Sequence, residues 1–355
     1  MDNKNNRPDF WKTRLDEVDA IMKTVKKGKA RVVTKSAGGR DVYLVEYGDK
    51  QDFNRTANYS SALGAGSPKY YADRDGKKPV IFIIGAEHGG EVEGTAAILN
   101  LVQMIETGKD FRGLSNPYLA KCINNCRLLM IPIANPDGRA RMPLDTVHGM
   151  RFEEFRHWGQ GRWKDGSLCD YPACKTVHPI KDHVSFLGTY FNDDGINIVH
   201  DDFFGNKANE TQAILDTADK ESPDFTINLH GGGSVINEID HADYMPLYAK
   251  ERVQELKMRA KAEADKIGLP SLINAIREDN FNPPRTFNLF SAQHFICGTT
   301  SILYESNQGL DFTGERALDP AWETYYSYEE ILNLHYILFE QTIRFALEER
   351  SGKND

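Results

Sequence analysis

The sequence has no excess of basic residues and no long apolar run. Its 355 residues include 43 lysines and arginines against 52 aspartates and glutamates, for a formal net charge of −9. An acidic chain of this kind lacks the basic face with which proteins bind nucleic acid, so we expect no nucleic-acid partner. No apolar stretch approaches the length of a membrane span, so we expect no membrane partner either.

Cysteine is also scarce, and the sequence shows no secretory leader. Five cysteines are an odd number, so at least one thiol is free unless the chain pairs with another. The segment Met1–Pro8 lacks the apolar core of a signal peptide. Both features favour a cytoplasmic location, although a leader removed from the chain would make it a secreted protein. Oligomeric state is left open by the sequence. The chain also lacks the Gly-x-Ser-x-Gly elbow that serine hydrolases need.

A histidine and a glutamate follow the most apolar stretch of the chain. Val80–Ile84 is continuous enough to be a buried strand, and it is followed by His88 and Glu91. A strand ending in His-x-x-Glu places an imidazole and a carboxylate on one short turn, where both can bind one metal ion. A zinc site needs a third protein ligand, and a lone histidine at a strand end can equally be structural.

Three later segments repeat this pattern of an apolar run that ends in a reactive or turn-forming residue. They are Arg127–Ile133 before the turn Asn135–Gly138, Phe225–Leu229 before His230, and Ser301–Tyr304 before Glu305. In open α/β sheets, ligands and chemistry collect beyond the carboxyl ends of the strands. We therefore expect the two histidines and the two glutamates of these segments to lie together at one edge of a sheet.

This set contains what a hydrolytic zinc site requires. His88, Glu91 and His230 would bind Zn2+ and leave a fourth position for water, whose pKa the metal lowers. Glu305 would be the general base, because a carboxylate that does not bind the metal keeps its lone pairs free for a proton. The alternative is that Glu305 pairs with an arginine at the sheet edge.

The ordered motifs resemble those of the zinc carboxypeptidase family, the carboxypeptidase A-like metallopeptidases. His-x-x-Glu, Asn-Pro-Asp-Gly, a distant strand-ending His and a later strand-ending Glu occur in that order between residues 79 and 310. Ala37–Tyr47 also looks like the opening hairpin of these enzymes. The resemblance implies a single α/β domain with a mixed, mainly parallel sheet and helices on both faces.

We expect an N-terminal helical segment over residues 1–30 and a peptidase-like domain over 31–350. Residues 139–195 are rich in Arg, His, Trp and Gly with little periodicity, and we interpret them as a long loop over the active-site edge. Cys169, Cys174, His178 and His183 fall within this loop and leave a second zinc site conceivable. Helices are expected over the segments 10–25, 91–105, 208–219, 248–266 and 328–349.

The resemblance fails at the residues that hold a substrate carboxylate. The family's Asn and Arg clamp is replaced by Val199 and His200, and a neutral imidazole cannot form the bidentate fork of guanidinium. An arginine from the long loop would have to replace it. Asn197 stands where the family has an aspartate that orients a zinc-binding histidine, and its carbonyl could accept the N–H of His88.

Two further family features have no clear match. For the arginine that stabilises the oxyanion, Arg151, Arg156 and Arg162 are candidates, and we favour Arg162 for that role. Arg151, Arg156 and His200 are then predicted to bind substrate. The family tyrosine is absent, because no tyrosine lies between Tyr248 and Tyr304. His294 is the nearest polar substitute in that stretch.

The sequence therefore predicts a zinc-dependent peptidase whose substrate is a peptide. Two alternatives remain open. One is a deacylase of small N-acyl amino acids, similar to the aspartoacylase and succinylglutamate desuccinylase group, which shares the His-Gly-Gly-Glu motif. The other is a non-catalytic peptide-binding relative, which the altered clamp permits.

Overall fold

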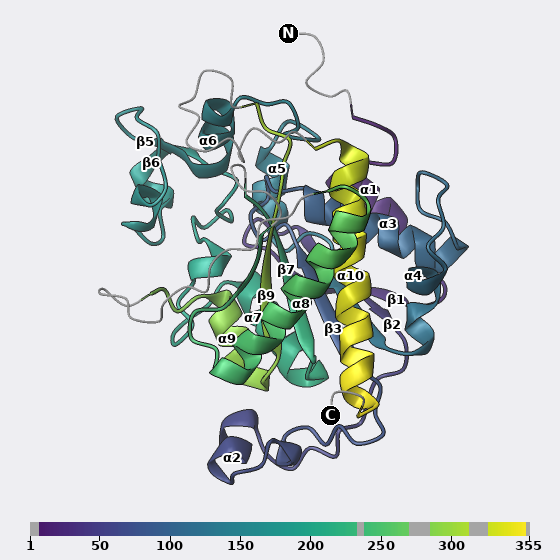
Figure 1. Ribbon diagram of the computed structural model, residues 1–355. Coiled ribbons are helices and arrows are strands. Elements are labelled where there is room, and N and C mark those ends of the chain that lie inside the picture. The colour runs from purple at the N-terminus through teal and green to yellow at the C-terminus, as the bar shows by residue number, and fades with distance from the viewer. Residues whose placement is uncertain (1–6, 233–237, 270–284, 312–325, 353–355) are drawn as a thin grey trace.

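Seven strands of the described chain form one mixed sheet (Figure 1). The computed structural model describes residues 7–232, 238–269, 285–311 and 326–352. Across the sheet the order is β1-β2-β4-β3-β7-β9-β8. The strands are β1 (Lys29–Lys35), β2 (Asp41–Tyr47), β3 (Val80–Gly85), β4 (Arg127–Ile131), β7 (Phe225–Gly231), β8 (Glu238–His241) and β9 (Thr300–Ser306). The four central strands are parallel, and β1, β2 and β8 are antiparallel to their neighbours. This confirms the predicted mixed sheet.

The central strands are apolar along their whole length because both of their faces are covered. Every residue of β3 and β4 is buried, and so is every residue of β7. Parallel strands covered by helices on both sides show such continuous apolar runs instead of an alternation. In register, Ile83 pairs with Met130 on one side and with Ile227 on the other. The carboxyl ends of β3, β7 and β9 are thereby brought to the same edge.

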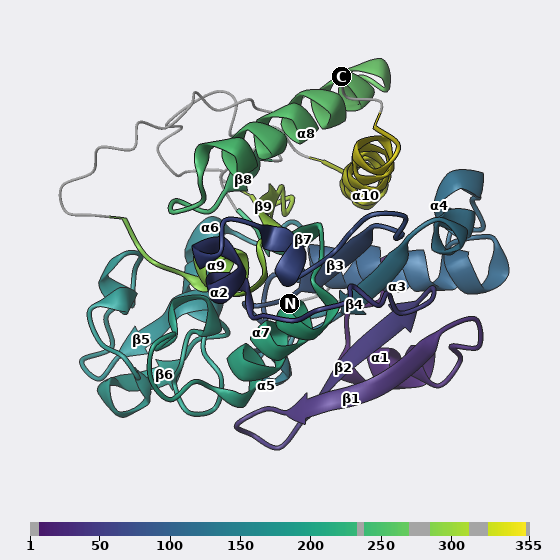
Figure 2. The ribbon, with the colours of Figure 1, turned by 90° about the horizontal axis from the view of Figure 1, so that it is seen from below.

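Helices cover both faces of the sheet, as Figure 2 shows from below. On one side lie α3 (Glu93–Thr107), α8 (Leu247–Lys266) and α10 (Tyr328–Arg350), and on the other α7 (Asn209–Glu221) and α9 (Leu289–Cys297). Shorter helices are α2 (Tyr59–Gly64), α4 (Pro117–Lys121) and α5 (Pro136–Arg141). Within the ranges described, none of the helices has the length and apolar character that crossing a membrane requires.

The N-terminal helix is shorter than the sequence predicts. The spacing of apolar residues predicts a helix from Phe10 to Val25, whereas α1 spans Leu15–Met22. It begins there because the Glu17 carboxylate accepts the backbone N–H groups of Thr13 and Arg14 at 2.9 and 3.0 Å. Residues 7–14 are not helical, and Phe10 is buried against the core in a non-helical conformation.

The segment predicted to be a long irregular loop contains regular structure. It forms α6 (Phe152–Gln160) and a two-stranded antiparallel ribbon of β5 (Gly161–Trp163) and β6 (Val184–Leu187). A separate small core with Cys169, Cys174, Ile180 and Phe191 stabilises this segment. The strands were not predicted because three or four residues are too few to show a period of two.

Candidate active site

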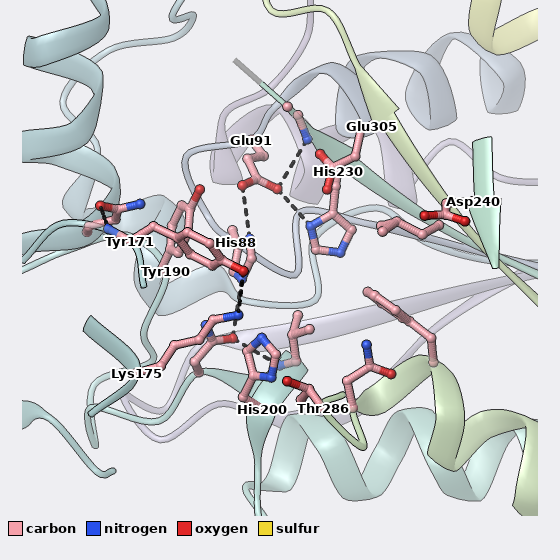
Figure 3. Close-up of a pocket in the computed structure, with 18 of the residues that line it drawn as sticks. His88, Glu91, Tyr171, Lys175, Tyr190, His200, His230, Asp240, Thr286 and Glu305 are labelled. Carbon is pink, nitrogen blue, oxygen red and sulfur yellow. Dashed lines mark hydrogen bonds and ion pairs between the residues drawn. The ribbon is translucent and has the colours of Figure 1, made fainter. Parts of the chain in front are cut away.

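Two imidazoles and one carboxylate converge at the carboxyl ends of β3 and β7 (Figure 3). His88 Nδ1 lies 2.9 Å from Glu91 Oε1, and His230 Nδ1 lies 2.9 Å from Glu91 Oε2. The three ligand atoms lie within 4.8 Å of one another, and all three residues are buried. This donor set fits zinc, which binds imidazole nitrogen and carboxylate oxygen and keeps an open position in catalytic sites.

The second metal site considered for the long segment is not found. Among the residues that the structure describes, His88, Glu91 and His230 are the only group of three or more His, Cys, Asp or Glu side chains close enough to hold an ion. Cys169 and Cys174 instead lie in the small apolar core of that segment, where burial raises the pKa of both thiols. Both cysteines therefore contribute to packing.

Each histidine has a polar partner on the nitrogen that faces away from Glu91. Asn197 Oδ1 lies 3.3 Å from His88 Nε2, and Glu87 Oε2 lies 2.9 Å from His230 Nε2. A ring that binds metal through Nδ1 carries its proton on Nε2, so both partners act as acceptors that fix the tautomer and the ring orientation. Glu87 was not predicted from the sequence. Its position as a charged residue at the end of an otherwise apolar run could have indicated a role at the site.

Glu87→Gln is expected to weaken zinc binding about 10-fold. Glutamine keeps an acceptor oxygen for His230 but removes the negative charge that makes the imidazole more basic, and such outer partners are worth about 10- to 100-fold in metal affinity. Competition with a chromophoric chelator would measure the zinc dissociation constant. The matched control is Glu93→Gln. Glu93 is equally buried, but its carboxylate accepts from Gln308 at 3.4 Å. Equal weakening in both variants would contradict a specific role for Glu87.

Glu305 lies beside the proposed ligands without belonging to their group. It pairs in register with His230 across the parallel strands β7 and β9, and its carboxylate is directed to the same side as Glu91 (Figure 3). Burial is the main cause that raises its pKa to about 7, with further contributions from Glu91, Glu238 and Asp240, against the opposing effect of His230. A carboxylate with a pKa near neutrality is well suited to accept and release a proton.

These residues line one cavity of about 1020 Å3. Glu238, Asp240 and Asp243 form an acidic wall next to Glu305, and the long segment contributes the opposite wall with Arg156, Asp170, Tyr171, Lys175 and Tyr190. Pockets for small molecules have volumes of about 300–1,000 Å3. This cavity is therefore large enough for several residues of a peptide.

The positions that replace the family's carboxylate clamp are at the cavity. Val199 and His200 both line it, as the sequence motif predicts for clamp positions. Burial lowers the pKa of His200 to about 3, with the nearby charge of Lys175 as a further cause. The imidazole is thus neutral at neutral pH and offers a single N–H donor, which is weaker recognition of a carboxylate than a guanidinium provides.

Of the three predicted arginines, the structure brings one to the cavity. Arg162, favoured as the oxyanion donor, donates from Nε to His157 Nδ1 at 3.0 Å and from Nη1 to the Gly166 carbonyl at 2.8 Å, outside the lining residues. Arg151 is exposed and pairs with Glu153 at 3.0 Å, also away from the cavity. The structure therefore does not bring these two predicted side chains to the cavity, because both make their contacts on the β5–β6 ribbon and α6. Arg156 lines the cavity and lies 3.3 Å from Asp170.

Tyr171 and Tyr190 line the cavity, and both come from the segment predicted to lie over the active-site edge. The ring of Tyr190 stacks on His88, with centroids 3.9 Å apart and planes 3° apart. His294, considered as a polar substitute, is buried on α9 and bonds to the Thr299 carbonyl at 2.8 Å, so its role is structural. The sequence did not predict Tyr190, because no motif marks it and its contact with His88 joins segments far apart in the chain.

Sequence comparison assigns the family. A family model described as zinc carboxypeptidase matches residues 19–311. The chain belongs to the zinc carboxypeptidase family. Zn2+ is the metal of this family, and His88, Glu91 and His230 group as its potential ligands. None of the curated proteins matches the sequence.

Several solved structures share the fold. A metallo-carboxypeptidase from Burkholderia cenocepacia has a TM-score of 0.55 at 13% identity, covering 93% of this chain and 68% of its own. Carboxypeptidase A from Helicoverpa armigera has a TM-score of 0.52 at 15% identity, covering 97% and 76%. Bovine thrombin-activatable fibrinolysis inhibitor, solved with tick carboxypeptidase inhibitor, has a TM-score of 0.56 at 12% identity, covering 96% and 99%. At these identities the likeness concerns the fold alone.

Proposed function

We propose that this protein is a zinc-dependent peptidase that hydrolyses an amide bond of a peptide. The observation that carries the proposal is the convergence of His88 Nδ1, His230 Nδ1 and the Glu91 carboxylate beside a separate, half-buried carboxylate, Glu305. A protein that only bound peptides would need neither the donor set nor the additional base.

In the proposed mechanism, His88, Glu91 and His230 hold the zinc, and Asn197 and Glu87 keep the two rings oriented. Zinc, when bound, supplies a Lewis acid that polarises the scissile carbonyl. Glu305 takes a proton from the attacking water and passes it to the amine leaving group. Arg156 remains the candidate among the three arginines for the oxyanion, since it lines the cavity.

The size and walls of the cavity favour a peptide over a small N-acyl amino acid. A volume of about 1020 Å3 with polar residues on opposite walls leaves room for groups on both sides of the scissile bond. The experiment has to distinguish the peptidase from two alternatives, a deacylase of N-acyl amino acids and a non-catalytic peptide-binding protein.

A substrate panel tests the proposal. Zinc-loaded protein would be assayed with N-blocked tri- and tetrapeptides and with N-acetyl and N-succinyl amino acids, and repeated after chelation. We expect zinc-dependent hydrolysis of the peptides, with the N-acyl amino acids at least about 10-fold poorer in kcat/KM, because they leave most of the cavity unfilled. A preference for the N-acyl amino acids would support a deacylase, and no hydrolysis at all would support a binding protein.

A further inference from the structure

Lys175 lines the cavity and has no carboxylate partner among the described residues. The other Lys or Arg side chains that line the cavity in the described part of the chain are Arg156 and Arg285. Arg156 lies 3.3 Å from Asp170, and Arg285 lies 3.7 Å from Asp243. For Lys175, the contacts among the described residues are the Tyr171 hydroxyl at 3.4 Å and the Tyr171 ring at 4.4 Å. Within the ranges described, the ammonium of Lys175 is therefore uncompensated by a carboxylate.

The side chain of Lys175 reaches into the cavity, toward the space between Tyr171 and His200 (Figure 3). Tyr171 holds it there, because the ammonium lies over the ring and donates to the hydroxyl. On the facing side, the ring of His200 has no hydrogen-bond partner within the described part of the chain. Lys175 and His200 thus present two N–H donors to the same region of the cavity.

The charge of Lys175 makes this region the place for an anion, because the two other cations that line the cavity, Arg156 and Arg285, already lie beside Asp170 and Asp243. We propose that Lys175, with His200, forms the subsite that binds a carboxylate of the substrate. This rests on the proposed function, and it assigns to a lysine of the long segment the recognition that Val199 and His200 alone do not provide. The carboxylate is either the terminal one or that of an acidic side chain.

Steady-state kinetics of Lys175→Met, with Lys175→Arg beside it, tests the subsite on three N-blocked peptides. One has a free terminal carboxylate, one has a terminal amide, and one has a terminal amide with a glutamate as its last residue. We expect Lys175→Met to raise KM about 10- to 100-fold for the substrate whose carboxylate is bound, with kcat little changed. Lys175→Arg should restore most of the affinity because it keeps the charge. The control is Lys181→Met, an exposed lysine of the same segment that lies 3.9 Å from Asp194.

Equal loss on all three peptides, or no loss on any, would overturn the subsite. The free-carboxylate and glutamate peptides identify which source of carboxylate is used. Should no peptide be hydrolysed, the proposed function fails, but calorimetry with two acids, N-acetyl-phenylalanine and N-acetyl-glutamate amide, and with the neutral N-acetyl-phenylalanine amide still decides the subsite. Wild-type protein is expected to bind one of the two acids at least about 10-fold more tightly than the neutral amide, and Lys175→Met to lose that difference. Equal binding of all three ligands by the wild type would exclude the subsite.

Discussion

Glu305→Gln is expected to lower kcat/KM by about 10²- to 10⁴-fold while zinc remains bound, because the amide cannot accept a proton from water. The substitution keeps the shape of a half-buried side chain, and it removes a carboxyl whose pKa is raised to about 7 chiefly by burial. Initial rates on a peptide substrate, together with the zinc content of the purified variant, measure the effect. Retention of full activity would exclude Glu305 as the base.

The pH dependence provides a second readout of the same substitution. A general base works only when ionised, so wild-type kcat/KM should fall as the pH drops through the pKa of Glu305. The positive charge of zinc favours the ionised carboxylate, so the midpoint should lie at or below about 7. Glu305→Gln should lose this dependence. A variant that keeps the wild-type profile at reduced rate would assign the titration to another group.

His230→Ala is expected to abolish zinc binding and, in addition, to destabilise the metal-free protein by about 3–5 kcal/mol. Burial disfavours the imidazolium, but the carboxylates of Glu91 and Glu87 outweigh that effect and raise the pKa of His230. Removing the ring leaves Glu87 fully buried, with its Oε1 already without a partner among the described residues. Urea unfolding of chelated protein would measure the loss of stability.

His88→Ala is the matched comparison. His88→Ala removes the same kind of zinc ligand as His230→Ala. Zinc affinity should therefore fall by more than about 100-fold in both variants, which exceeds the loss expected from changing a residue that only hydrogen-bonds to a ligand. Both variants remove a partner of Glu91, but the other group left behind by His88→Ala is Asn197, which is neutral and also accepts the backbone N–H of Val199 at 3.1 Å. His88→Ala should therefore cost clearly less stability than His230→Ala. Equal destabilisation would mean that the ion pairs of His230 contribute little.

Several parts of the site could be read from the sequence because their geometry is local. His88 and Glu91 are three residues apart on one turn, so their proximity follows from the chain itself. The apolar runs before His230 and Glu305 predict parallel strands, and parallel strands carry their ends to one edge. The central sheet, the long helices and the proposed ligand set therefore follow from pattern and order.

The predicted side chains that the structure places away from the cavity are ones whose direction depends on packing over long sequence distances. Arg162 and Arg151 have sequence neighbourhoods much like that of Arg156, but α6 and the β5–β6 ribbon direct only Arg156 into the cavity. The short strands of that segment pair through contacts that no periodic pattern encodes. Sequence spacing cannot specify which face of such a segment meets the substrate.

The sequence by itself determined the family, the sheet and the residues proposed to hold zinc and move the proton, because each lies at the end of an apolar strand. The tertiary structure alone decided what surrounds them. It placed Glu87 behind His230, Tyr190 against His88, and Lys175 beside His200. These residues act through contacts between segments far apart in the chain, and such contacts exist only once the sheet and the long segment have packed together.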